Sequence, residues 1–260
     1  MGSINQALTC GAFSRGGKTP MAELFATAAE IGFKGIDLPG AYDIKEVVKE
    51  APKHGLTVAA MAGHASLRDG LNKLENHDRI EQELRDNIAF AADNNVRNLV
   101  CFSGDRNGLD DYTGLLRCAE GLKRVAGFAE EKGVNLVVEL LNSKVNHPDY
   151  QCDRTLWGVI LCELVGSPRV GLLYDIYHMQ IMEGDLIRSI QNYGKYFLHY
   201  HTAGNPGRKD LDDQQEIYYP AVMRAIAATG YEGFVGHEFS PKDMSDPIAA
   251  LRQAYEVCNI

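Results

Sequence analysis

The sequence lacks several features that mark whole classes of protein. It has no run of about 18 consecutive apolar residues, which a transmembrane helix would need. The start of the chain, Met1 to Thr9, shows no basic stretch followed by an apolar core, so we expect no secretory signal. None of the 6 cysteines forms a CxxC pair, which argues against a disulfide framework or a cysteine zinc site. Reduced thiols in a cytoplasmic protein are therefore expected.

Positive charge is also scarce. The chain has 26 Lys and Arg against 35 Asp and Glu, which gives a formal net charge of −9. Phosphates repel such a chain, so a wide nucleic-acid-binding face is not expected. Of the 260 residues, 45% are hydrophobic and 23% are charged, which is close to the average for soluble globular proteins and excludes a disordered chain.

Short apolar runs alternate with longer amphipathic stretches along the whole chain. The runs typical of buried parallel strands are 7–13, 34–38, 56–62, 97–103, 134–141, 170–175, 196–202 and 233–239. The stretches with a helical period are 20–31, 43–53, 79–94, 113–131, 154–165, 181–193, 219–229 and 246–258. Eight strand–helix units without a break in composition predict an α/β protein with a single (β/α)8 TIM barrel domain over residues 1–260. No GxGxxG follows the first strand, which argues against a dinucleotide-binding fold.

Polar residues stand at the ends of the last four apolar runs. They are Glu139, Asp175, His201 and Glu238. In a (β/α)8 barrel the active site lies at these carboxyl ends. Three carboxylates and one imidazole suit a divalent ion such as Mn²⁺ or Mg²⁺, with Co²⁺ or Zn²⁺ also compatible. A charge at the end of a buried strand is costly unless it is paired or metal-bound, so we interpret these four residues as metal ligands.

Three further polar residues are expected at the same rim and are candidates for substrate binding. His178 follows Asp175 by three residues, which suits a fifth ligand or a hydrogen-bond donor to a substrate oxygen. Arg208 lies in the loop sequence GNPGR, where a guanidinium can clamp a carboxylate or hydroxyls. His64 follows the third apolar run by two residues, at the end of AAMAGH (59–64), and is expected to face the same cavity. His237 should point away from the side of Glu238 and is expected to be structural.

The C-terminal half of the chain carries long motifs that resemble a known family. They are the E-x-x-N of Glu139 to Asn142, YDIYHMQIMEGDL (174–186), HTAGNPGR (201–208), EIYYP (216–220) and GYEGFVGHEFSP (230–241). Residues 134–242 resemble the xylose isomerase-like TIM barrels, a sugar isomerase and epimerase superfamily, and are most similar to its hydroxypyruvate isomerases.

The resemblance implies metal ligation by the four strand-end residues and substrate contacts by His178 and Arg208. It also implies that Glu139 and Glu238 are catalytic, standing on opposite sides of the substrate and moving protons. The expected reaction removes a proton next to a carbonyl and passes through an enediolate, whose charge the metal stabilises. For hydroxypyruvate the product is tartronate semialdehyde, and Arg208 would neutralise the substrate carboxylate.

The sequence leaves alternative functions open. His201 is typical of ketose 3-epimerases, whereas many hydroxypyruvate isomerases carry Gln there. A keto-sugar lyase or dehydratase would use the same metal and enediolate, and a barrel that binds a metabolite without turning it over would look similar. An endonuclease IV-like hydrolase is disfavoured, because the run 97–103 ends without further metal ligands and the net charge is negative. The expected partner is a small hydroxy-carbonyl compound or sugar, without nucleic acid or membrane, and a homo-oligomer is left open.

Overall fold

The structure is a computed structural model that describes residues 4–14, 16–38 and 40–260. Eight short strands alternate with helices in this part of the chain. The strands are β1 (Asn5–Thr9), β2 (Gly35–Asp37), β3 (Thr57–Ala62), β4 (Asn98–Cys101), β5 (Asn135–Glu139), β6 (Val170–Asp175), β7 (Phe197–Thr202) and β8 (Phe234–His237). They follow one another in chain order around a closed barrel. The predicted fold class, a (β/α)8 TIM barrel, is confirmed.

Helices fill the segments between the strands, as the amphipathic stretches predict. The α-helices are α1 (Cys10–Phe13), α2 (Met21–Ile31), α3 (Ile44–Glu50), α4 (His77–Asp93), α5 (Asp111–Lys132), α6 (Thr155–Val165), α7 (Ile176–Met182), α8 (Leu186–Tyr193), α9 (Tyr219–Ala228) and α10 (Pro247–Cys258). Three short 3₁₀ helices are η1 (Ala51–His54), η2 (Leu74–Asn76) and η3 (Gly194–Tyr196). No helix in these described ranges is long and apolar enough to cross a membrane.

The chain divides into two compact units, which are described separately. The first consists of Met1–Met61, Asp185–Gly194 and Tyr200–Ile260, and the second of Ala62–Gly184 and Lys195–His199. That residues 1–260 form one domain stays a prediction of the sequence.

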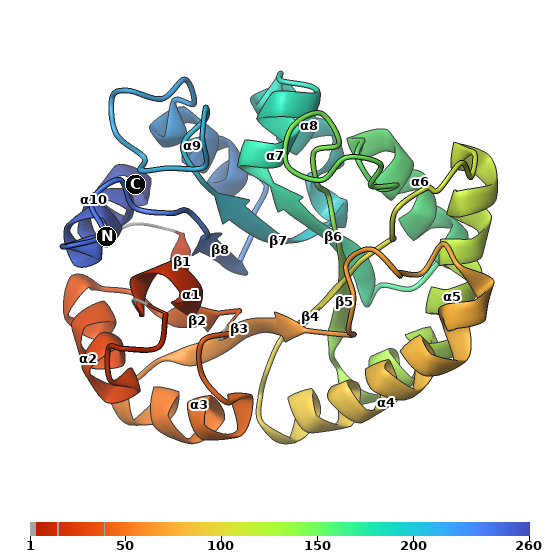
Figure 1. The fold of residues 1–260 in the computed structure, drawn as a ribbon, viewed down its shortest axis with the longest axis horizontal. Helices are drawn as coiled ribbons and strands as arrows, with labels where there is room; N and C mark the ends of the chain where they lie inside the picture. The colour runs from red at the N-terminus through yellow and green to blue at the C-terminus, as the bar shows by residue number, and fades with distance from the viewer. Residues whose placement is uncertain (1–3, 15, 39) are drawn as a thin grey trace. The chain divides into compact units, whose positions relative to one another are not determined.

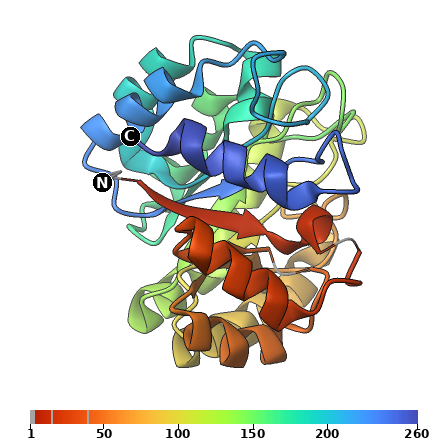
Figure 2. The ribbon, with the colours of Figure 1, turned by 90° about the vertical axis from the view of Figure 1, so that its left-hand side faces the viewer.

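The first unit is built on β1, which pairs in parallel with β2 on one side and with β8 on the other. Strand β8 in turn pairs in parallel with β7, and β2 with β3. Figure 2 shows α10 and α2 flanking β1. The two helices meet where the ring of Phe33, just after α2, packs 5.2 Å from the ring of Tyr255 in α10. The carboxyl ends of these strands are thereby held in fixed register.

The second unit is built on β4, β5 and β6, which are parallel neighbours. All five residues of β5 and all six of β6 are buried, as expected of strands covered on both faces. Helices α4, α5 and α6 run along the outer side of these strands (Figure 1). Helix α5 begins at the N-cap Asp110, whose side chain accepts the backbone N–H of Thr113, and ends at Gly133 in the left-handed conformation. Capping thus fixes both ends of the longest helix in the described chain.

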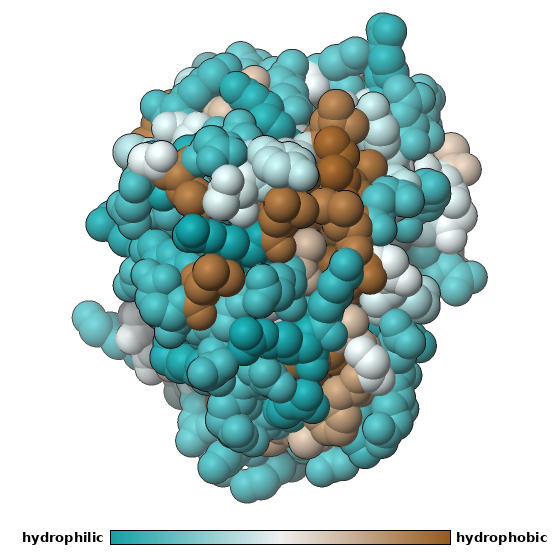
Figure 3. All heavy atoms as spheres, turned by 90° about the vertical axis from the view of Figure 1, so that its right-hand side faces the viewer, coloured by the Kyte–Doolittle hydropathy of each residue, from teal (hydrophilic) through white to brown (hydrophobic). Residues whose placement is uncertain are grey.

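Helix α6 is apolar on its outer face as well as on its inner one. Leu156, Ile160 and Leu164 recur at every fourth residue and are exposed, and Leu116 of α5 is exposed as well. Trp157 and other residues of the opposite face are buried. Figure 3 shows apolar side chains gathered on this side of the molecule.

Two predicted elements were wrong in their bounds. The apolar run 7–13 was expected to be one strand, but β1 ends at Thr9 and Cys10–Phe13 forms the short helix α1. The stretch 181–193 was expected to be one helix, but it spans the end of α7 and the whole of α8. The break lies at Gly184 and Asp185, whose φ angles of 65° and 46° place them in the left-handed region, where a right-handed helix cannot continue.

Candidate functional site

Two buried acids stand at the carboxyl ends of β5 and β6. Glu139 is the last residue of β5 and Asp175 the last of β6, and they are 5% and 1% exposed. Glu139 is in register with Leu173, and Asp175 follows Leu173 by two residues, so both acids point to the same side of the sheet. A carboxylate oxygen of one lies within 4.8 Å of a carboxylate oxygen of the other. Two buried carboxylates this close repel each other, and a cation between them would offset that repulsion.

His178 is held beside Asp175 by the first turn of α7. The Asp175 carboxylate caps this helix by accepting the backbone N–H of His178 at 2.9 Å. The His178 Nδ1 atom accepts the backbone N–H of Asn142 at 3.1 Å. Because a backbone N–H can only donate, Nδ1 carries no proton, and the neutral ring is protonated on Nε2. This Nε2 lies 3.8 Å from the Asp175 carboxylate, so His178 presents a hydrogen-bond donor at the strand ends.

Asn142, the last residue of the E-x-x-N motif, therefore fixes the orientation of His178. Its side-chain amide also contacts His178 Nδ1 at 2.5 Å. Sequence reasoning assigned it no role. Tyr150 was missed too, although its hydroxyl donates to the Glu139 backbone carbonyl at 3.0 Å and accepts the Ser103 backbone N–H at 3.1 Å. Burial raises the pKa of Tyr150 well above its usual range, so this hydroxyl stays protonated and keeps donating.

His64 lies after β3 with both ring nitrogens bonded to the backbone. Its Nε2 accepts the Phe102 N–H at 2.9 Å, so Nδ1 carries the proton and donates to the Ala65 carbonyl at 3.0 Å. Burial lowers the pKa of His64, which favours this neutral form. The ring ties the loop after β3 to the end of β4. Substrate contact by His64 stays a prediction, and it would require one of these backbone bonds to open.

In the first unit, His201 and Glu238 lie side by side. His201 of β7 is in register with Gly236, and Glu238 follows Gly236 by two residues, so both side chains point to the same side. The His201 Nδ1 atom lies 3.0 Å from the Glu238 carboxylate. His201 is fully buried, while the Glu238 side chain is 26% exposed. An imidazole nitrogen and a carboxylate oxygen at this separation form half of the predicted ligand set.

Arg208 lies next to Glu238, a contact that the sequence did not predict, and substrate binding by Arg208 stays a prediction. Its Nη2 is 2.7 Å from the Glu238 carboxylate. Its backbone lies in the left-handed region, with φ 56°, which is uncommon for a residue with a side chain and clusters at functional sites. A cavity of about 210 Å³ opens here, lined by Thr9, Gly11, Leu38, Arg208, Glu238, Phe239 and Ser240. A guanidinium and a carboxylate therefore share one small cavity.

The loop that carries Arg208 is held by the EIYYP motif. The Tyr219 hydroxyl accepts the Ala203 backbone N–H at 3.0 Å and donates to the Ala203 carbonyl at 2.7 Å. The Glu216 N–H donates to the Asn205 carbonyl at 2.8 Å. A backbone bridge between Gly204 and Lys209 closes the loop. The HTAGNPGR and EIYYP motifs, noted separately in the sequence, are thus bonded to each other in the structure.

Asp37 is a site residue that sequence reasoning missed. It is the last residue of β2 and is fully buried. Its carboxylate lies 3.1 Å from His201 Nε2, the nitrogen on the other edge of the ring from Glu238. The available signal was an acid inside the apolar run 34–38, where a buried charge needs a partner.

His237 lies away from the site, as predicted. Its Nε2 lies 2.8 Å from the Gln6 side-chain oxygen and its Nδ1 lies 2.7 Å from the Thr202 hydroxyl. Burial lowers the pKa of His237 to about 3, with the neighbouring His201 as a second cause. The neutral ring is a structural link between strands.

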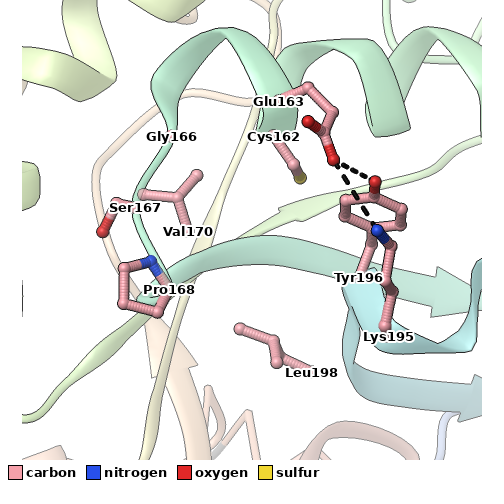
Figure 4. Close-up of a pocket in the computed structure, with 9 residues that line it drawn as sticks. All are labelled: Cys162, Glu163, Gly166, Ser167, Pro168, Val170, Lys195, Tyr196 and Leu198. Carbon is pink, nitrogen blue, oxygen red and sulfur yellow. Dashed lines mark hydrogen bonds and ion pairs between the residues drawn. The ribbon is translucent and has the colours of Figure 1, made fainter.

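A second cavity of about 300 Å³ lies at the opposite end of β6, beside its first residue Val170. Figure 4 shows Glu163 there, in contact with the Tyr196 hydroxyl and with Lys195. The Lys195 ammonium lies 4.6 Å from the centre of the Tyr196 ring. Glu163, Lys195 and Tyr196 contact one another here, and none of the predicted site residues lines this cavity.

Comparison with known proteins identifies the family. Residues 25–259 match the xylose isomerase-like TIM barrel family. The chain belongs to this family. It is 27% identical over 239 residues to the hydroxypyruvate isomerase of Escherichia coli K12, with 88% of this chain and 90% of that protein covered. It is 24% identical over 237 residues to the 2-oxo-tetronate isomerase of Pectobacterium atrosepticum, with 87% and 89% covered.

Other relatives match over a shorter stretch. A human relative is 29% identical over 138 residues, and there the match spans about half the length of each protein.

Solved structures share the barrel. A Brucella melitensis protein described as an AP endonuclease of family 2 superposes with a TM-score of 0.82 at 28% identity, covering 95% of this chain and 97% of that one. A D-psicose 3-epimerase of Clostridium cellulolyticum, crystallised with D-tagatose, gives a TM-score of 0.80 at 20% identity, covering 99% and 100%. This second likeness shows the fold alone. The Escherichia coli and Pectobacterium relatives carry the names of different substrates, so the site must be argued from this chain's own residues.

Proposed function

We propose that this chain is a metal-dependent isomerase that moves a proton on a small hydroxy-carbonyl substrate, with hydroxypyruvate converted to tartronate semialdehyde. The observation that carries the proposal is the contact of Arg208 with Glu238 in one small cavity. A guanidinium there suits a substrate carboxylate, and a carboxylate beside it suits proton transfer. The names of the Escherichia coli and Pectobacterium relatives support an isomerase of small keto acids.

The proposed metal ligands are Glu139, Asp175, His201 and Glu238. Support comes from the strand order, in which β5, β6, β7 and β8 are consecutive in the barrel and each brings one donor to its carboxyl end. Three carboxylates and an imidazole, mostly buried, fit a divalent ion, and Mn²⁺ or Mg²⁺ is preferred over Co²⁺ or Zn²⁺. When bound, the ion supplies Lewis-acid stabilisation of negative charge on substrate oxygens.

The proton is moved by Glu139 and Glu238. One carboxylate removes it from the carbon next to the carbonyl, and the same or the other carboxylate returns it to the neighbouring carbon. Glu139 is almost completely buried, which keeps water away from the reacting carbon.

The substrate is oriented by Arg208 and His178. Arg208 exchanges part of its contact with Glu238 for the substrate carboxylate, which frees a Glu238 oxygen. The His178 Nε2–H, fixed by the backbone of Asn142, donates to a substrate oxygen. His64 is the third proposed substrate contact, and it would open one of its two backbone hydrogen bonds to make this contact.

A second candidate function is ketose 3-epimerisation. The observation that favours it is His201, the residue type expected of epimerases at this position, which is held on both edges of its ring. Both reactions begin with the same proton abstraction, so they differ in what Arg208 contacts: a carboxylate in the keto acid or hydroxyls in the sugar.

We further propose a cytoplasmic location and no nucleic-acid partner. All 6 cysteines are buried and free, which suits a reducing compartment. The net charge of −9 opposes binding to phosphate backbones. A homo-oligomer stays an expectation, which analytical ultracentrifugation tests.

Proton exchange in D₂O tests the function. The Mg²⁺-loaded protein is incubated with hydroxypyruvate, fructose, psicose or tagatose, and deuterium uptake at carbon is followed by NMR. Uptake with hydroxypyruvate that stops on chelation is the expected result. Arg208→Gln should abolish it, while Arg224→Gln, a change at an exposed residue of α9, should not. Uptake with ketoses alone would favour the epimerase, and no uptake with bound metal would exclude both reactions.

A further inference from the structure

Asp37 is a buried acid that the proposed chemistry does not use directly. It ends β2, and its side chain is fully buried, as is that of His201. Burial removes the hydration of a carboxylate, and a charged or hydrogen-bonded partner is needed to offset that cost. The residue that Asp37 meets is His201, at 3.1 Å between Oδ2 and Nε2.

The strands of the first unit are built to allow this contact. Ala7 of β1 is in register with both Gly35 of β2 and Gly236 of β8, and Asp37 follows Gly35 by two residues. Asp37 therefore points to the same side of the sheet as Ala7 and Gly236, and the residues on that side between β2 and β8 are small. A Cβ added at Gly236 would lie 2.1 Å from the Asp37 carboxylate and 3.0 Å from the His201 ring. The absence of a side chain at Gly236 leaves the space in which Asp37 reaches His201.

The two nitrogens of His201 face two different acids. Nδ1 lies 3.0 Å from Glu238, the predicted ligand, and Nε2 lies 3.1 Å from Asp37. An imidazole that binds a metal through one nitrogen carries its proton on the other, and a carboxylate that accepts this proton fixes the ring and strengthens the ligand. We infer that Asp37 is a positioning residue: it accepts the Nε2–H of His201 and so turns Nδ1 toward the metal.

This inference rests on the proposed metal site but not on the substrate. It predicts that the affinity for Mn²⁺ is highest in the wild type, lower in Asp37→Asn and lowest in Asp37→Ala. Asparagine retains an oxygen that can accept the Nε2–H without the charge, whereas alanine removes this acceptor. Loss of such a partner weakens metal binding by about 10- to 100-fold. The matched control is Asp153→Asn, because Asp153 is another buried carboxylate, 6% exposed, which bonds Arg106 and Ser143.

The experiment uses the whole chain in two measurements. Titration of the metal-free protein with Mn²⁺, followed by EPR of the free ion, gives affinity and stoichiometry. NMR of ¹⁵N-histidine-labelled protein loaded with Zn²⁺ gives the tautomer of the His201 ring. In the wild type we expect the proton of the His201 ring on Nε2. In Asp37→Ala we expect the ring to show no single tautomer. In Asp153→Asn we expect a Mn²⁺ affinity close to that of the wild type.

Each other outcome is decisive. Wild-type affinity and an unchanged His201 tautomer in Asp37→Ala would overturn the inference, as would a wild-type protein that binds no Mn²⁺. Two ions per wild-type chain, with one lost in Asp37→Asn, would make Asp37 a ligand instead. The wild type could instead bind one ion, and the three proteins could follow the predicted order of affinity, without proton exchange on any substrate. The proposed function would then fail while the role of Asp37 stands.

Discussion

Glu238 is the residue on which the site of the first unit depends. It contacts the ring of His201 on one side and the Arg208 guanidinium on the other. Under the proposed function, this one carboxylate binds a metal, moves a proton and releases the arginine to the substrate. In the same proposal Glu139 of the second unit binds the metal and moves a proton, and its backbone carbonyl accepts a hydrogen bond from the Tyr150 hydroxyl.

Replacing either glutamate should abolish turnover. Glu238→Gln and Glu139→Gln keep the shape of the side chain but remove a charged ligand and a proton carrier together. General acid–base catalysis alone contributes about 10²- to 10⁴-fold, so kcat should fall by at least that factor. The control is Glu163→Gln in the cavity at the other end of β6, which should leave kcat unchanged. Near-normal turnover in either site variant would contradict the proposed mechanism.

At the scale of elements, the acids of the candidate site lie at the ends of strands, and the Arg208 guanidinium lies on a loop. The loop after β7 carries Arg208 to Glu238. Its backbone is bonded by the Tyr219 hydroxyl and closed by the bridge between Gly204 and Lys209. A Cβ at Gly204 would lie 2.2 Å from the Asp210 carbonyl oxygen, far inside contact distance. We predict that the backbone of this loop sets where the Arg208 guanidinium lies.

Two glycine substitutions test this reading. Gly204→Ala should cost about 1–3 kcal/mol of stability, because the loop must shift, and should raise KM for hydroxypyruvate by displacing Arg208. Gly127→Ala, in the exposed interior of α5 with nothing within 4 Å of the new Cβ, should instead stabilise by about 0.5–1 kcal/mol and leave KM unchanged. Urea unfolding and steady-state kinetics measure both effects. An unchanged KM in Gly204→Ala would show that the loop tolerates the shift.

At the scale of the whole molecule, the proposed metal links folding to binding. An ion that binds the folded chain at 100 times its Kd adds about 2.7 kcal/mol. For a protein of this size that raises Tm by roughly 5–10 °C. Differential scanning fluorimetry with Mn²⁺ should show this rise, and EDTA should reverse it.

The control for metal removal is Asp175→Asn. Asparagine caps helices as well as aspartate, so α7 should keep its N-cap and the metal-free Tm should change little. The variant should nevertheless lose most of the Mn²⁺-dependent rise. A full rise in Asp175→Asn would place the metal elsewhere in the chain.

Much of the fold could be predicted from the sequence, because apolar residues follow different patterns in buried parallel strands and in amphipathic helices. The sequence misplaced the ends of elements where local backbone geometry decides them, as at Asp185, where a left-handed residue splits the expected helix 181–193. Of the candidate site, the strand-end acids, His178 and Arg208 were named from chemistry and position. The supports of those residues, Asn142 and Tyr150, were not, because an amide or a phenol in a loop has no pattern that distinguishes it from packing.

The sequence by itself determined the alternation of strands and helices, the family motifs and the types of donor at the strand ends, since all of these are local properties of the chain. Only the tertiary structure decided which groups meet. Asp37 and His201 are 164 residues apart, yet their side chains lie 3.1 Å apart. That contact depends on strand register and on the missing side chain of Gly236, which only the folded chain brings together.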